Sequence, residues 1–254
     1  MKNKKGFIRL PLLLMMGAFM VFTISCKNHK LSDNGTVVLL ENSFKDTRDG
    51  NIYKTVKIGD QVWMAENLKY LPSVVGPDSG STTVPLYYVY GYNGTNIAEA
   101  KATDNYKTYG VLYNWSAAMA SNSSGVEGVC PCGWHLPSDA EWKQLEMYLG
   151  MTKKQANAVG WRGTGVGGKL KEADTLHWRR PNTGATNESG FAALPGGYRS
   201  GGNFYNIGNY AVWWTATESD ERGAWNRYMR YDYSKVYRNC GTKYSGYSVR
   251  CVKD

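Results

Sequence analysis

A chain of 254 residues with a formal net charge of +9 is mildly basic, and its thinly spread cations do not indicate a nucleic-acid partner. No internal repeat, charge block or second low-complexity linker divides residues 41–254, which therefore fit one domain with a substantial core. The 29 glycines, 19 tyrosines and 9 tryptophans, with few long apolar runs, indicate a loop-rich α+β or β-rich domain with an aromatic core.

The first 25 residues are typical of an export signal. Four cations precede an apolar segment over residues 10–24, which is shorter than the roughly 20 residues of a membrane span. The segment ends at Ser25-Cys26 and resembles a bacterial lipoprotein signal, which is cut before the cysteine. We therefore expect a palmitate-type acyl anchor on Cys26, a tether over residues 26–40, and attachment to the cell envelope at the outer membrane. A plain secretory signal with a chance cysteine is the alternative.

Three elements are predicted in the first half of the domain. Apolar and polar residues alternate on both sides of Gly59-Asp60, which predicts a β-hairpin over residues 55–68. Residues 72–108 are polar and tyrosine-rich, and we expect an extended insertion with at most one short strand. Residues 109–120 carry apolar side chains at i, i+4 and i+8, which predicts a short helix ended by the polar run that follows.

The strongest helix signal lies at residues 138–150. Ser138 and Glu141 have the spacing of a capping box, in which each side chain bonds the backbone amide of the other residue. Gly150 supplies the residue that tolerates a left-handed conformation and ends the helix. Three apolar residues share one face of this helix: Trp142, Leu145 and Leu149.

The last third of the chain combines glycine-rich loops with alternating segments. The glycine-rich run over residues 160–168 lacks the spacing of a phosphate-binding or dinucleotide-binding loop, so a flexible surface loop is expected. From residue 210 onward, the alternation predicts the closing strands of a sheet. In one of these strands Trp225, Met229 and Tyr231 share a face, which we expect to point inward.

Four cysteines remain once Cys26 is set aside, and an exported domain favours their pairing in disulfides. A bond between Cys130 and Cys132 would close a strained ring. Each of these two is therefore expected to pair with Cys240 or Cys251, and both arrangements stay open. Zinc binding is disfavoured, because the C-x-C pattern lacks the C-x₂-C spacing of zinc sites.

Six segments, spread in one order from Val56 to Asp254, resemble the Fibrobacter succinogenes major paralogous domain family, which is common in Bacteroidetes and Fibrobacteres surface lipoproteins. They are VKIGDQVWMAENL, YGVLYNWSAA, CPCGWHLPSDAEW, GFAALPGGYR, WWTATE and SVRCVKD. The resemblance implies an α+β, C-type-lectin-like fold, with two helices flanking a small irregular antiparallel sheet and long glycine-rich loops. It also implies the pairs Cys130–Cys251 and Cys132–Cys240, since the first pair occupies the cysteine positions of the family motifs.

The resemblance suggests two activities, a cysteine-dependent oxidase and a calcium-dependent lectin, and the residues of this chain favour neither. The distantly related formylglycine-generating enzyme uses a closely spaced C-terminal cysteine pair, whereas Cys240 and Cys251 are well separated. Lectins of this fold bind calcium through a Trp-Asn-Asp strand, but Arg227 stands where the aspartate should be. The chain holds only three histidines and no hydrolase or metalloprotease motif. We expect no enzyme, no cofactor and no metal, with a formylglycine-generating-enzyme-like oxidoreductase as the alternative.

A metal-free binding surface for a glycan or a surface protein is expected in the loop region over residues 177–210. Aromatic faces stack on sugar rings, and this region combines aromatic residues with glycines, serines and asparagines. The candidate residues are Trp178, Arg179, Tyr198, Tyr205 and Tyr210. One of Trp213 and Trp214 should also point outward if their strand is regular. In the alternative interpretation, these rings cover a small core.

Overall fold

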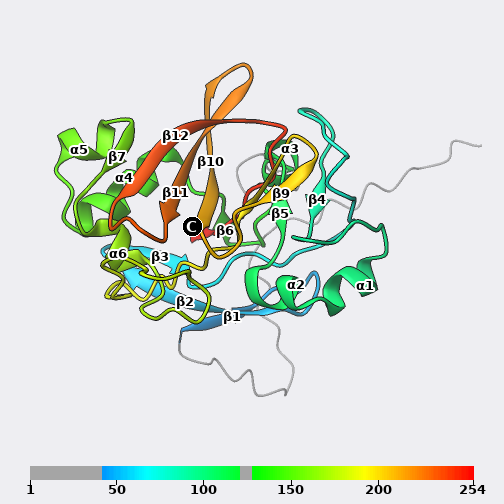
Figure 1. Cartoon of the computed structure of the whole chain (residues 1–254), viewed down its shortest axis with the longest axis horizontal. Coiled ribbons are helices and arrows are strands. Elements are labelled where there is room, and N and C mark those ends of the chain that lie inside the picture. The colour runs from blue at the N-terminus through cyan, green and yellow to red at the C-terminus, as the bar shows by residue number, and fades with distance from the viewer. Residues whose placement is uncertain (1–41, 121–127) are drawn as a thin grey trace, which may run out of the picture. The chain divides into compact units, whose positions relative to one another are not determined.

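The computed structural model describes residues 42–120 and 128–254. The export signal, Cys26 and the tether lie outside the described residues, as does the polar run from residue 121 that is expected to end a helix. The described residues form a mixed α/β structure of mostly antiparallel sheets and a few short helices (Figure 1). Within this part of the chain, no helix has both the length and the apolar character needed to cross a membrane.

A five-stranded sheet combines strands from both ends of the described chain. In spatial order they are β1 (Ser43–Lys45), β2 (Ile52–Ile58), β3 (Gln61–Met64), β13 (Val252–Lys253) and β6 (Trp134–His135). β2 and β3 form the hairpin predicted over residues 55–68, and Gly59 adopts a φ of 62° in its turn. Val252 pairs with both Trp63 and His135, so β13 lies between β3 and β6.

The predicted disulfide between Cys130 and Cys251 is formed, and it links positions 121 residues apart. Cys251 immediately precedes β13 and Cys130 lies shortly before β6, so the bond ties two neighbouring strands together. The predicted bond between Cys132 and Cys240 is wrong, because both are exposed free thiols. Cys132 stays beside β6 in the five-stranded sheet, whereas Cys240 lies on a strand of a different sheet.

The closing strands predicted from residue 210 form a second, four-stranded antiparallel sheet. In spatial order they are β10 (Tyr210–Asp220), β11 (Gly223–Arg230), β12 (Val236–Thr242) and β7 (Gly160–Arg162). Trp225 and Met229 share one face of β11 as predicted, and Met229 is buried. Arg227 lies between them on that face, which is the inner one, because its guanidinium bonds the carboxylate of Glu146 at 2.7 Å.

Six short helices lie among the described residues. They are α1 (Ile97–Ala102), α2 (Asp104–Tyr109), α3 (Trp115–Ala118), α4 (Asp139–Tyr148), α5 (Lys153–Asn157) and α6 (Val166–Leu170). α4 begins with the predicted capping box, in which the Glu141 amide donates to the Ser138 hydroxyl at 3.2 Å. The Ser138 amide donates in turn to the Glu141 carboxylate at 2.7 Å. The three predicted core residues of α4 are buried: Trp142, Leu145 and Leu149.

Two segments before α4 differ from the prediction. Within residues 109–120, β5 (Leu112–Tyr113) precedes the one-turn helix α3, because the Asn114 side chain accepts from the Ala117 amide and starts the helix late. The insertion over residues 72–108 contains α1 and α2 in addition to one short strand. That strand, β4 (Tyr87–Tyr88), pairs with β5.

The glycine-rich run over residues 160–168 is not a surface loop, since it contributes β7 and the start of α6. Gly167 and Gly168 are buried. A β-carbon on Gly168 would collide with the carbonyl of Gly184, so this glycine serves a close approach between two backbone segments. A further hairpin follows, formed by β8 (Tyr198–Ser200) and β9 (Asn203–Tyr205).

Candidate functional site

The five candidate binding residues fall into different environments. Trp178 belongs to the core: its side chain is 1% exposed, packs in a cluster with Trp142 and Phe191, and donates from Nε1 to the Ala193 carbonyl at 2.8 Å. The prediction that it forms a binding surface is therefore wrong. Burial of its large apolar ring outweighs the polar character of the surrounding loop.

Arg179 is exposed, and its guanidinium lies over the ring of Tyr231, with 5.2 Å from Cζ to the ring centroid. The adjacent tryptophans of β10 do alternate between the two faces of the sheet, but both Trp213 and Trp214 are fully buried. Trp214 is covered by Tyr247, whose ring centroid lies 4.2 Å away, so neither tryptophan is the outward-facing ring that the strand pattern predicted.

Tyr198 and Tyr210 are the two candidates that line a pocket on the outer face of the four-stranded sheet. Tyr205, which is 41% exposed, stacks on Tyr198 with ring centroids 5.6 Å apart and therefore borders the same region. The structure thus brings three of the five candidate residues together, and it places Trp178 and Arg179 elsewhere.

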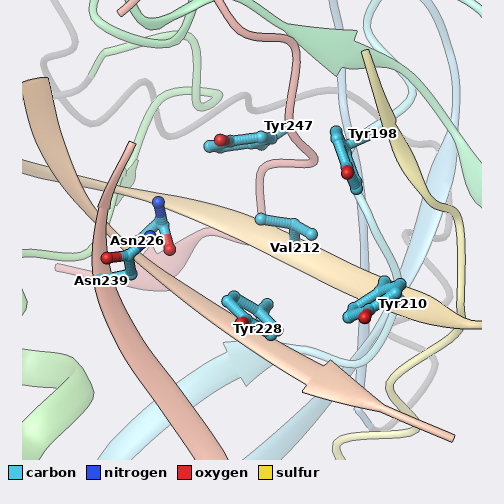
Figure 2. Close-up of a pocket in the computed structure, with 7 residues that line it drawn as sticks. All are labelled: Tyr198, Tyr210, Val212, Asn226, Tyr228, Asn239 and Tyr247. Atoms are coloured by element: carbon cyan, nitrogen blue, oxygen red, sulfur yellow. The ribbon is translucent and has the colours of Figure 1, made fainter. Parts of the chain in front are cut away.

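The pocket has a volume of about 230 Å³. Figure 2 shows Asn226 and Asn239 at one end and Tyr198 and Tyr210 at the other. Tyr228 and Tyr247 lie on opposite sides between these ends, with Val212 between them. The lining residues are Tyr198, Tyr210, Val212, Asn226, Tyr228, Asn239 and Tyr247.

Strand register places most of these residues on one face. Tyr228 lies opposite Val212 on β10, and Asn226 lies opposite Asn239 on β12. Side chains two positions apart on a strand point to the same side, so these four residues share the outer face. Arg227 points to the inner face, toward α4. The pocket and the buried ion pair between Arg227 and Glu146 therefore lie on opposite sides of the same sheet.

Asn226 holds an unsatisfied hydrogen-bond acceptor beside the pocket. Its side chain is 2% exposed, and its Oδ1 has no hydrogen-bond partner among the described residues. A buried polar atom without a hydrogen-bond partner lowers the stability of the fold by about 1–3 kcal/mol. Most buried polar atoms in folded proteins therefore have a partner. A ligand that donates a hydrogen bond here would remove that cost.

Two phenols of the pocket, those of Tyr228 and Tyr247, stay neutral at physiological pH. Burial raises the pKa of Tyr228 well above its usual value, and it raises the pKa of Tyr247 to about 12. The described residues that line the pocket include no carboxylate, amine, guanidinium, thiol or imidazole. The pocket can therefore offer ring faces, hydroxyl groups and amide groups, a chemistry suited to binding a neutral polar ligand.

Five pocket residues were not predicted from the sequence: Val212, Asn226, Tyr228, Asn239 and Tyr247. Three of them were accessible to pattern analysis. If Trp225 and Met229 point inward, then Asn226 and Tyr228 must point outward, and the same alternation continues on β12. Tyr247 lies outside the regular strands, and no local signal identifies it.

The structure also shows where the cysteines lie that an oxidoreductase activity would need. Cys251 is bonded to Cys130 and is not available to form a redox pair with Cys240. The Cys240 Sγ lies 2.7 Å from the Ser219 Oγ and 3.6 Å from the Asp220 carboxylate. Within residues 42–120 and 128–254, no group of three or more His, Cys, Asp or Glu side chains is arranged to hold a metal ion.

Comparison with known proteins gives one family match. The model of the Fibrobacter succinogenes major domain matches residues 56–253, which include most of the β2–β3 hairpin, α4, both cysteines of the disulfide and every residue that lines the pocket. No curated protein and no solved structure matches the chain.

Proposed function

The chain belongs to the Fibrobacter succinogenes major domain family, and from the pocket on its four-stranded sheet we propose that it is a non-catalytic module that binds a carbohydrate. The observation that carries the proposal is the buried Asn226 Oδ1, an acceptor without a partner in a pocket walled by four tyrosines. Sugars combine hydroxyl donors with apolar ring faces that stack on aromatic side chains, and this combination matches both properties of the pocket.

Binding is proposed to need no metal ion. In calcium-dependent lectins of the C-type fold, an aspartate follows the Trp-Asn pair. Here Arg227 follows it, and its guanidinium lies 2.9 Å from Asp139 and 2.7 Å from Glu146 on the inner face. A cation held there neutralises the nearby carboxylates and repels a divalent ion. The proposed ligand contacts are therefore hydrogen bonds and ring stacking.

The finer fold assignment is also a proposal: a C-type-lectin-like arrangement. Its support is the five-stranded sheet, in which the last strand, β13, lies beside the early strand β3, together with a separate sheet bearing the loops.

We further propose that Cys26 carries a lipid that anchors the protein in the cell envelope at the outer membrane. The support for this anchor is the apolar segment over residues 10–24 followed by Ser25-Cys26.

A glycan array probed with the full chain in detergent micelles tests the proposed function. Wild-type protein should bind at least one class of glycan, and Asn226→Ala and Tyr228→Ala should each weaken that binding. The loss of one aromatic contact, on the order of 1 kcal/mol, corresponds to about a fivefold weaker affinity.

Tyr148→Ala is the matched control, because Tyr148 is 66% exposed on α4, away from the residues that line the pocket. It should bind as the wild type does. Unchanged affinity in a folded Tyr228→Ala variant, or an array on which the wild type binds nothing, would reject the proposal.

A further inference from the structure

We infer that the ligand is an uncharged, extended glycan chain whose successive sugar units lie along a line of aromatic rings that crosses the four-stranded sheet. The inference rests on the proposed function and adds the length and charge of the ligand. We call this line of rings the aromatic track. Its members, in spatial order, are Tyr233, Trp161, Tyr237, Tyr228, Tyr210, Tyr198 and Tyr205.

Ring contacts make the track continuous. From Tyr205 it passes through Tyr198 to Tyr210, with centroid separations of 5.6 and 6.5 Å. Tyr228 follows 5.7 Å from Tyr210, and Tyr237 lies 4.4 Å from Tyr228.

At its far end the track reaches the edge of the sheet. Trp161 lies 5.0 Å from the Tyr237 ring, and Tyr233 stacks on Trp161 at 4.6 Å. Each of these rings is at least partly exposed. A ligand lying on the outer face can therefore meet ring surface along the whole line.

The track runs across the strands, since successive strands contribute one ring each. Trp161 comes from β7, Tyr237 from β12, Tyr228 from β11 and Tyr210 from β10. Trp161 also lies 5.2 Å from Tyr228, which lies 5.7 Å from Tyr210, so the part of the track from Trp161 to Tyr210 spans about 11 Å at most. Tyr198 continues the line on the β8–β9 hairpin.

The pocket accounts for only the middle of this line. Its volume of about 230 Å³ is below the roughly 300 Å³ at which pockets for drug-sized ligands begin, and it ends at Tyr228 and the two asparagines. Tyr237, Trp161 and Tyr233 continue the aromatic surface beyond it. A ligand of one sugar unit would leave that surface unused, whereas a chain would occupy both parts.

Charge along the track favours a neutral ligand. Arg230 lies beside the track, 5.9 Å from the Tyr210 centroid and 4.9 Å from that of Tyr233. Its guanidinium is held by both carboxylate oxygens of Asp232, at 2.5 and 2.6 Å. The paired charges of Arg230 and Asp232 cancel, so this ion pair offers no net charge to attract an acidic polysaccharide.

A proline-rich peptide is the competing extended ligand, because such peptides also lie on aromatic surfaces. Its backbone offers mainly carbonyl acceptors, since proline has no N–H. Asn226 Oδ1 is itself an acceptor and needs a donor. Sugar hydroxyls supply donors at every unit of the chain, and this requirement favours the glycan.

Calorimetric titration of the full chain in micelles tests the inference. The probes are neutral cello-, xylo- and manno-oligosaccharides from the monosaccharide to the hexasaccharide, polygalacturonate as the acidic glycan, and a decaproline peptide. For at least one neutral series, affinity should rise with chain length. Tyr233→Ala, at the end of the track outside the pocket, should weaken hexasaccharide binding by about fivefold and leave disaccharide binding unchanged, since one ring contact contributes on the order of 1 kcal/mol.

Tyr205→Ala, at the opposite end of the track, repeats the length test should Tyr233→Ala fail to fold. Asn226→Ala should weaken short and long ligands alike. Equal affinity for short and long chains, or preference for polygalacturonate, overturns this inference and leaves carbohydrate binding in place. Binding of decaproline with no binding of any glycan overturns the proposed function as well.

Discussion

Arg227 and Arg238 lie directly opposite each other on β11 and β12, and both guanidinium groups contact Asp139 in the first turn of α4, at 2.9 and 2.8 Å. Like charges facing each other across two strands are normally destabilising. Here the carboxylates of Asp139 and Glu146 neutralise them. Burial tends to raise the pKa of Asp139. Hydrogen bonds from Arg238 and the charge of Arg227 outweigh burial and hold this pKa far below its usual value. The charges thus fasten α4 to the inner face.

We predict that Glu146→Ala lowers the free energy of unfolding by about 3–5 kcal/mol, because it removes the carboxylate that pairs with Arg162 and one of the two that pair with Arg227. The Glu146 carboxylate contacts Arg162 at 2.6 Å and Arg227 at 2.7 Å. Urea denaturation measures the change. Glu188→Ala is the control: its exposed pair with Lys169, at 3.3 Å, should contribute less than about 1 kcal/mol. Equal losses in the two variants would contradict the prediction.

We predict that stability declines as the pH rises from about 6.5 to about 9, because His135 is charged in the folded protein. Its two ring nitrogens lie 2.6 Å from Glu141 and 2.6 Å from Asp254. The hydrogen bond to Glu141 raises the pKa of His135 to about 9, against the opposing effect of burial and with a further contribution from Asp254. A raised folded-state pKa stabilises fully below the unfolded value and loses that effect as the pH passes through 9.

His135→Gln should be less stable than the wild type at pH 6, and its unfolding free energy should change less over the same pH range. Denaturant titrations at several pH values measure both profiles. Parallel profiles for the variant and the wild type would show that another group causes the decline.

We predict that Cys251→Ser lowers the free energy of unfolding by about 4–5 kcal/mol, since its disulfide closes a loop of 121 residues. Cys132→Ser is the matched control and should be nearly neutral, because Cys132 is an exposed free thiol. Thermal unfolding of both variants, with and without reductant, measures the effect. A non-reduced digest that joins Cys132 to Cys240 would contradict the connectivity seen in the structure.

We predict that Trp178→Ala and Tyr205→Ala have opposite consequences, although both residues were candidates for the same surface. Trp178 is core, and its truncation should cost about 3–5 kcal/mol of stability. Tyr205 is exposed, and its loss should change stability by about 0.5 kcal/mol or less while it weakens glycan binding. Melting temperatures and the calorimetric titration distinguish the two. A stable Trp178→Ala variant would place that ring outside the core.

Local signals predicted the elements whose residues act on their near neighbours. The hairpin over residues 55–68 follows from strict alternation, and α4 follows from a cap and an apolar stripe within one stretch. The glycine-rich run was misassigned, because glycine permits both a flexible loop and a tight backbone contact. Only the position of Gly184 decides between these for Gly168.

The site was predicted only in part, because local sequence signals do not show which residues distant segments bury. Tyr198 and Tyr210 stood out as aromatic residues among turn residues, but so did Trp178, and its burial depends on packing by distant segments such as α4. Asn226 and Tyr228 lie on a regular strand, where alternation shows which residues share a face but not which face a ligand can reach. Tyr247 lies far from the other pocket residues of β10 and β11 in the sequence, and only the tertiary fold brings it to the pocket.

The position of β13 affects how the protein can be made. Because this strand occupies the place between β3 and β6, the five-stranded sheet cannot be completed until residues 252 and 253 have left the ribosome. Until then, β3 and β6 each present an unpaired edge, and such edges invite aggregation. A chain truncated before residue 252 would therefore leave this sheet open at its centre, with β3 and β6 on either side of the gap.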